Sequence, residues 1–200
     1  MAATANLLAR RAVATLAMRH AVVGTPGRAN MERFIAATFG ARYGATICSF
    51  APNLVALERH GEIYAAAGWR CAGDELLFLE TYLDDPIEAL LAHATGQAVA
   101  RHGIAEVGHL SSARRGGTVD VIAGLSRNLA RLGFEWVVFT ATAELISIFN
   151  RLSLPLLALA PADPARLGDA ACDWGTYYDT RPVVVAGPIR LALHRSNGLG

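Results

Sequence analysis

Residues Ile104 to Thr140 read IAEVGHLSSARRGGTVDVIAGLSRNLARLGFEWVVFT, and this stretch decides the fold. Its pattern predicts a strand with a small polar end, a basic glycine turn, an amphipathic helix and a second apolar strand. The first turn of such a helix has unpaired backbone N–H groups, and two arginines just before it add positive charge. The stretch therefore predicts a site for an anionic cofactor. The residues of the turn are Arg114, Arg115, Gly116, Gly117 and Thr118.

The segments on either side predict further helices and strands around a central sheet. A hairpin followed by alternating strands and helices is typical of an α+β, or mixed α/β, domain. We expect one domain over residues 1–200, in which residues 1–30 form a basic helix and the first strand. Pro182 and Pro188 predict that the last strand lies at an edge of the sheet. The expected helices cover residues 5–18, 31–43, 87–97 and 143–152, the expected strands cover 19–24, 53–60, 62–72 and 182–189, and apolar runs cover 76–83 and 154–160.

Composition excludes several classes of function. All 18 basic residues are arginines, which excludes a Walker A lysine, a Schiff-base lysine and a lysine base. A net charge of +1 gives no global field for nucleic acid, so we expect no nucleic-acid partner. Three cysteines without C-x-x-C spacing argue against a disulfide framework or a zinc site, and the sequence has no other metal motif. We therefore expect a cytoplasmic protein without a metal.

Residues 1–30 carry four arginines and no acidic residue before Met31, as a membrane-surface segment would. Their apolar runs are short and interrupted by arginine, which argues against a signal peptide or a spanning helix. A leading helix docked on the domain is therefore favoured over membrane contact, which stays open.

The order of the expected elements resembles that of the GNAT acyltransferases and the acyl-homoserine-lactone synthases. Several strings are similar, in order, to the thermostable hemolysin family over residues 34–187. The resemblance implies a GNAT-like central, mostly antiparallel twisted sheet flanked by helices. It also implies an N-acyltransferase that moves an acyl group from acyl-CoA or acyl-carrier protein to a small amine or amino-acid-like acceptor. The strings are LFLETYLDDPIE from Leu77, EVGHLSS from Glu106, FTAT from Phe139, NRLSL from Asn150 and WGTYYDTRPVVVAG from Trp174.

Two positions depart from the expected patterns. His109 stands where the family is expected to have Asn, and Val119 takes the last small position of a GNAT phosphate loop counted from Arg114. A carrier-protein thioester, with its acyl-phosphopantetheine arm, therefore stays open beside coenzyme A. A membrane-active lytic protein that uses the basic N-terminal arm is the alternative function, and a binding module with an inactive transferase fold is a third.

Glu106 is the first candidate for a catalytic base, because burial in a strand would raise its pKa. The alternative is a structural carboxylate paired with an arginine. His109 is the second candidate, either as a base or as a substrate contact, and it is otherwise a hydrogen-bonded structural histidine. The two residues face the same cavity only if a bulge intervenes, which Gly108 permits.

The remaining candidates surround the donor and the acceptor. The basic glycine turn would bind cofactor phosphates, unless it is a surface loop that starts a helix. Leu110, Ser111 and Ser112 would give backbone contacts to pantetheine. Glu80 is expected in a strand, where Arg70 would pair with it or both would bind the acceptor. An aromatic cluster would line the substrate pocket or pack over the core, and it consists of Trp174, Tyr177 and Tyr178, the last as acid for the departing thiolate.

Overall fold

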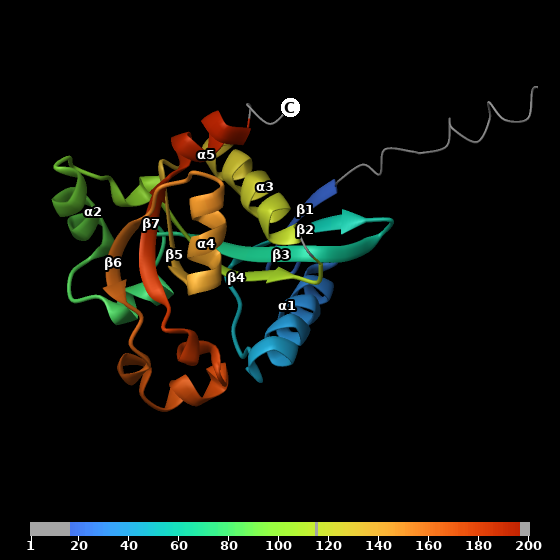
Figure 1. Ribbon diagram of the computed structural model, residues 1–200. Helices are drawn as coiled ribbons and strands as arrows, with labels where there is room; N and C mark the ends of the chain where they lie inside the picture. Colours follow the sequence, from blue (N-terminus) through green and yellow to red (C-terminus); the bar gives the residue numbers. More distant parts are fainter. Residues whose placement is uncertain (1–16, 115, 197–200) are drawn as a thin grey trace, which may run out of the picture.

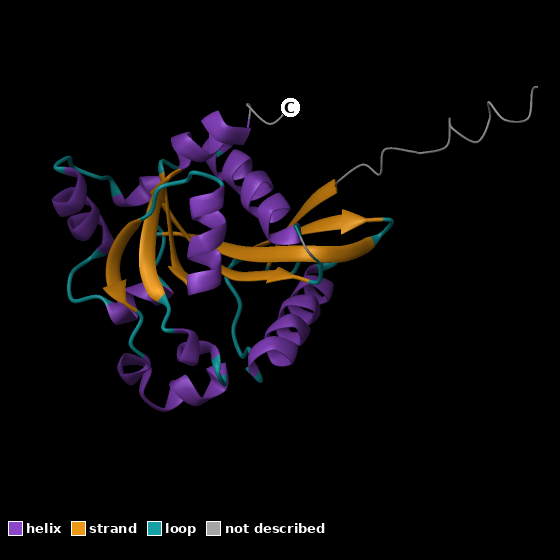
Figure 2. Ribbon diagram, viewed as in Figure 1, coloured by secondary structure: helices purple, strands orange, loops and turns teal. Residues whose placement is uncertain are grey.

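The computed structural model describes residues 17–114 and 116–196, with side chains to residue 193. These residues form a seven-stranded sheet with helices on both faces (Figures 1 and 2). The helix expected over residues 5–18 falls mostly outside the described residues, and its last two positions are wrong. Ala17 and Met18 instead begin β1 (Ala17–Val22), because they pair with β2.

The sheet is mixed and mostly antiparallel, as predicted. Its order is β1-β2-β3-β4-β5-β7-β6, and only β4 and β5 run parallel. The hairpin between β2 and β3 turns at His60 and Gly61, whose φ angles of 56° and 83° suit a tight hairpin turn. The strands after β1 are β2 (Asn53–Arg59), β3 (Glu62–Cys71), β4 (Ile104–Ser112), β5 (Trp136–Ala141), β6 (Leu157–Pro161) and β7 (Val183–Pro188).

The helices cover both faces of the sheet because the strands alternate buried residues between them. In β2, Leu54 and Ala56 pack with α1, whereas Val55 and Leu57 pack with α3. One face carries α1 and α2, and the other carries α3, α4 and α5. The bounds are α1 (Arg28–Tyr43), α2 (Ile87–Thr95), α3 (Gly117–Arg131), α4 (Ala143–Arg151) and α5 (Ile189–Ser196). None of the described helices is long and apolar enough to cross a membrane.

The predicted glycine turn leads directly into α3. Gly116 has a φ of 85°, which a side chain would strain, and the helix begins at Gly117. A Cβ on Gly117 would lie 2.3 Å from the Ser112 hydroxyl oxygen, so only glycine allows the helix start to approach β4 this closely. The apolar face of α3 is then buried on the sheet through Val121 and Leu125.

Two sequence-based expectations about strands are wrong. The run 76–83 is not a strand but contains a 3-10 helix, Phe78–Tyr82, whose amides bond to carboxylates instead of to a neighbouring strand. The last strand, β7, does not lie at an edge but between β5 and β6. Pro182 precedes this strand and Pro188 ends it, so neither removes a donor from its middle. Three other 3-10 helices lie at Arg101–Gly103, Pro164–Trp174 and Tyr177–Thr180.

Candidate active site

A large cleft opens where β4 and β5 separate. The two strands pair only from Ile104 with Trp136 to Glu106 with Val138. Beyond this point a cleft of about 1180 Å³ lies between them, with Val107 to Leu110 on one side and Phe139 and Thr140 on the other. Two neighbouring strands that diverge leave backbone groups on their facing edges for an extended ligand. The cleft is therefore suited to a chain-like molecule that inserts between the strands.

A bulge in β4 brings both base candidates to this cleft. The pairing with β3 shifts register between Ala66 and Gly68, and His109 has a φ of 55°. The extra residue changes the alternation of side chains, so Glu106 and His109 both line the cleft. The bulge that the sequence analysis required for Glu106 and His109 to face one cavity is therefore present.

The Glu106 carboxylate is buried and held by three donors. The backbone amides of Phe78 and Leu79 donate to it at 2.8 and 2.9 Å, and the Arg70 Nε lies 3.3 Å from its Oε2. Burial raises the pKa of this carboxyl, against the lowering effects of the Arg70 charge and the two amides. Glu106 is therefore a carboxylate held in one orientation, and it binds a proton more readily than an exposed carboxylate does.

His109 is buried among aromatic rings at the bulge. Its ring centroid lies 5.5 Å from that of Phe50 and 6.5 Å from that of Phe39. Burial lowers its pKa to about 4, helped by the charge of Arg70, so the imidazole is neutral at pH 7. Its Nδ1 has no hydrogen-bond partner among the described residues. Such a nitrogen is suited to a hydrogen bond with a ligand more than to carrying a full proton.

The aromatic cluster lies on the same wall of the cleft. Trp174, Tyr177 and Tyr178 all line it, and so does Tyr82, which the sequence did not single out. The Tyr82 and Tyr178 hydroxyl oxygens lie 2.5 Å apart. Burial raises the pKa of Tyr178, while the hydrogen bond with Tyr82 acts in the opposite direction. Tyr177 turns its hydroxyl to the Thr140 carbonyl at 3.5 Å.

Most of the glycine turn reaches the far end of the cleft. Its lining there includes Ser112, Arg114, Gly116 and Thr118, and the Arg114 guanidinium stacks 4.7 Å above the Tyr64 ring. Leu110 lines the cleft closer to Glu106. The remaining predicted contacts of this group are Ser111, which is buried and donates to the His109 carbonyl, Gly117, which packs on Ser112, and Arg115, which lies outside the described residues.

The expected pair of Glu80 with Arg70 is wrong. Glu80 pairs with Arg101 at 2.6 and 2.7 Å and does not line the cleft. Arg70 lines the cleft and pairs with Glu106 and, at 3.5 Å, with Glu75. Arg101 is the better partner because, at the start of the 3-10 helix Arg101–Gly103, it reaches both oxygens of Glu80. Of these two proposed substrate contacts, only Arg70 lines the cleft, as do the other two, Trp174 and Tyr177.

One ion pair beside the cleft was not predicted from the sequence. Arg42 at the end of α1 bonds to Glu144 at the start of α4, and both residues line the cleft. The ion pair thus joins α1 and α4, which lie on opposite faces of the sheet, beside the cleft. Among the described residues, no group of three or more His, Cys, Asp or Glu side chains could hold a metal ion.

Comparison with known protein families identifies the family of this chain. A model described as thermostable hemolysin matches residues 21–193. The chain belongs to the thermostable hemolysin family. Comparison of this hemolysin-family chain with the curated proteins gives no match.

Solved structures support the predicted GNAT-like fold. The AHL synthase LasI is 13% identical, with a TM-score of 0.59 over 90% of this chain and 95% of that chain. FeeM, an N-acyl amino acid synthase from uncultured soil microbes, is 12% identical, with a TM-score of 0.58 over 90% and 95%. BjaI, a CoA-dependent acyl-homoserine lactone synthase solved with SAM and isopentyl-CoA, is 10% identical, with a TM-score of 0.58 over 90% and 86%. Because the identities are only 10–13%, the likeness shows that the thermostable hemolysin chain shares the fold of these proteins, and it does not by itself show their functions.

Proposed function

We propose that this protein is a GNAT-like N-acyltransferase, which moves an acyl group from a thioester to a small amine or amino-acid-like acceptor. The observation that carries the proposal is the cleft that opens between β4 and β5 immediately beside the buried carboxylate of Glu106. The pantetheine arm of the donor would extend along β4 beyond Glu106, past Leu110 and Ser112. Either acyl-CoA or an acyl-carrier protein would deliver this arm.

The reaction is a direct attack on the thioester. The amine nitrogen attacks the carbonyl carbon, a C–N bond forms, and the C–S bond breaks. Glu106 accepts a proton from the nitrogen, because burial raises its pKa toward the range that a base near neutral pH requires. The amides of Phe78 and Leu79 hold the carboxylate in one orientation while it does so. The departing thiolate takes a proton from the Tyr178 hydroxyl.

The neutral imidazole of His109 contributes a hydrogen bond rather than a second base. Its pKa of about 4 makes it a weak proton acceptor, and its Nδ1, which is buried beside Gly68 without a partner among the described residues, would bond only to a polar group of the substrate that enters the bulge. In this role His109 is a positioning residue for the acceptor or the thioester. Arg70 and the aromatic wall around Trp174 and Tyr177 would surround the acceptor, whose carboxylate, if it has one, would meet the Arg70 guanidinium.

The basic glycine turn would hold the phosphates of the donor. Arg114 is fixed over the Tyr64 ring at the end of the cleft, and Gly116 and Thr118 line the same end. Cation and helix start together favour an anion there. Asp120, in the first turn of α3, accepts a hydrogen bond from the Tyr64 hydroxyl at 3.2 Å, which holds this carboxylate against the ring.

Amide formation tests the proposal. The purified protein is incubated with acetyl-CoA, octanoyl-CoA or octanoyl-carrier protein and a panel of amino acids and simple amines, and products are identified by mass spectrometry. We expect at least one N-acyl product, which the Glu106→Gln variant forms about 100–1000-fold more slowly. Absence of any amide with all donors, and of any thioester binding by calorimetry, would contradict the proposal.

The family description favours a second candidate, a directly lytic protein. Its basic arm, residues 1–28, lies largely outside the described residues. Leakage of liposomes by the purified protein alone, abolished by deletion of residues 1–28, would support this function. Leakage that requires a thioester and an amine, and that survives removal of the protein, would instead trace lysis to an N-acyl product.

A further inference from the structure

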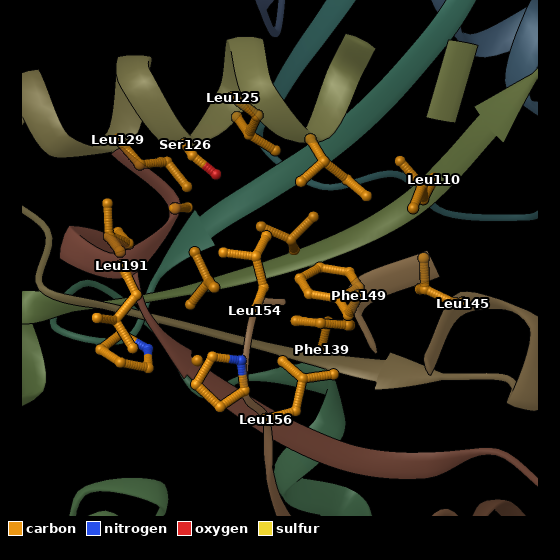
Figure 3. A pocket seen from close by; sticks show the side chains of 18 residues that line it. Leu110, Leu125, Ser126, Leu129, Phe139, Leu145, Phe149, Leu154, Leu156 and Leu191 are labelled. Carbon is orange, nitrogen blue, oxygen red and sulfur yellow. The ribbon is translucent and has the colours of Figure 1, made fainter. Parts of the chain in front are cut away.

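A second, smaller pocket lies beside the cleft. It is bounded by α3, α4 and α5 above β5 and β7 and has a volume of about 60 Å³ (Figure 3). Its lining is apolar except for one hydroxyl, that of Ser126 on α3. The reaction proposed above uses none of the side chains that line this pocket alone.

The pocket adjoins the cleft. Four side chains line both spaces, so the wall of one is the wall of the other; they are Val107, Leu110, Phe139 and Leu145. In Figure 3, Leu110 and Leu145 lie at one end of the pocket, and Ser126, Leu129 and Leu191 lie at the other. A chain that enters from the cleft would therefore pass Leu110 first and approach Ser126 last.

We propose that this pocket holds the tail of a medium-chain acyl group and that Ser126 selects a chain with an oxygen substituent near its far end. The inference rests on the proposed transferase function and names its donor class. The occupant is the acyl chain because the pocket begins where β4 and β5 diverge, beside the place of the thioester carbonyl. Water is a less favourable occupant, because a buried water molecule needs two to four polar partners and the side chains of the lining offer one hydroxyl.

The size of the pocket sets the length of the tail. A water-sized group needs about 10–15 Å³ on this measure, so 60 Å³ has room for roughly four to six carbons. Each methylene moved from water to an apolar wall multiplies the affinity by about four. With four to six of its tail carbons in the pocket, an octanoyl thioester should therefore bind roughly 250- to 4000-fold more tightly than an acetyl thioester.

Ser126 differs from its neighbours on the inner face of α3. Its side chain is buried and contributes a hydroxyl to the lining of the pocket, whereas Leu125 and Leu129 beside it are apolar. A hydroxyl or carbonyl oxygen on the chain would form a hydrogen bond with the Ser126 hydroxyl inside these apolar walls. The gain from one neutral hydrogen bond is about fivefold in affinity.

A filled pocket tests the tail site. Ala192 lines the pocket from α5, and Arg190 is exposed on the same helix, so Ala192→Phe and Arg190→Phe form a matched pair. Calorimetry would use the S-acetyl and S-octanoyl thioesters of N-acetylcysteamine, which lack both nucleotide and carrier protein. We expect Ala192→Phe to weaken octanoyl binding at least tenfold with acetyl binding unchanged, and Arg190→Phe to change neither.

The outcomes separate this inference from the proposed function. If acetyl and octanoyl thioesters bind equally, or if a folded Ala192→Phe variant binds the octanoyl probe like the wild type, the pocket is a packing gap and the inference is wrong. If acetyl groups are transferred and octanoyl groups are refused, only the inference fails. If no thioester of any length binds, the proposed function fails with it. Thermal unfolding of both variants establishes that they are folded.

Ser126→Ala tests the selection of an oxygen. The probes are octanoyl thioesters of N-acetylcysteamine with a hydroxyl at carbon 3, 5 or 7, each compared with the unsubstituted chain. In the wild type, we expect a hydroxyl at carbon 5 or 7 to raise affinity about fivefold, and Ser126→Ala to abolish this preference while binding of the plain chain improves. An unchanged preference in Ser126→Ala would overturn the assignment to Ser126.

Discussion

The hydroxyl oxygens of Tyr82 and Tyr178 lie 2.5 Å apart on the wall of the cleft, although 96 residues separate them in the sequence. If Tyr82 donates in this bond, the Tyr178 hydrogen is free to point toward the departing thiolate. The bond also favours the phenolate of Tyr178, against the burial that raises its pKa. The pair therefore makes Tyr178 a better acid than an isolated buried tyrosine.

Substitutions in this pair should separate acid from supporting residue. We expect Tyr178→Phe to lower kcat about a hundredfold, since a general acid contributes at least that much, and Tyr82→Phe to lower it about tenfold. Tyr177→Phe is the matched control, because its hydroxyl faces the Thr140 carbonyl. Steady-state release of free thiol gives the rates. Equal activity of Tyr178→Phe and Tyr177→Phe would remove Tyr178 from the mechanism.

The pH dependence of the reaction should report on Glu106. Burial raises the pKa of this carboxyl above its usual 4.5, so the active carboxylate form is gained only at a higher pH. We predict that kcat/KM rises with pH along a limb centred above 4.5, and that Glu106→Gln lowers it by a factor of about 100–1000. Glu75 also pairs with Arg70 but does not line the cleft, so the Glu75→Gln variant should retain activity. A limb that persists unchanged in residual Glu106→Gln activity would assign the base elsewhere.

Arg114 should act on donor affinity alone. Its guanidinium is held over Tyr64 at the end of the cleft, so Arg114→Ala should weaken coenzyme A binding about tenfold, and the difference should shrink as salt increases. Arg127→Ala, an exposed change on α3, is the control. Calorimetry at two salt concentrations measures both. Equal coenzyme A affinities in the two variants would move the phosphate site away from the glycine turn.

The Glu80–Arg101 pair should stabilise the protein rather than catalyse. Burial raises the pKa of Glu80, but hydrogen bonds from Arg101 and from the Leu77 and Ile87 amides outweigh it and lower the pKa to about 2. Because the folded pKa lies below the usual 4.5, this stabilisation is present above pH 4.5 and is lost as the pH falls toward 2.

Glu80→Gln should therefore cost about 2 kcal/mol of unfolding free energy at pH 7 and much less at pH 3. Urea unfolding at both values measures this difference. Glu62→Gln, at an exposed position, is the control. A loss that is the same at pH 3 and pH 7 would show that the ionised carboxylate is not what matters.

Local sequence signals predicted much of the fold. The glycine pair before α3, the helical spacing of Val121 and Leu125, and the hairpin turn at His60-Gly61 each act within a few residues, so they could be read directly. The place of β7 could not, because prolines at its ends resemble those of an edge strand. Strand order depends on contacts between distant segments, which periodicity does not record.

The candidate site was predicted in part for the same reason. Glu106 stood out as a carboxylate in an apolar strand, and Gly108 beside it allowed the bulge that turns His109 to the same cleft. The 3-10 helix Phe78–Tyr82 supplies partners to both Glu106 and Tyr178, although it is distant from both in the sequence. Neither the Phe78 amide nor the Tyr82 hydroxyl carries a local signal of its role.

A crystal structure with a non-hydrolysable octanoyl-pantetheine analogue tests the central claim most directly. We predict that the pantetheine arm lies between β4 and β5 beyond the Glu106–Val138 pair, with the carbonyl analogue beside Glu106 and the alkyl tail past Leu110. An analogue bound elsewhere, with side chains filling the space between the two strands, would contradict the claim.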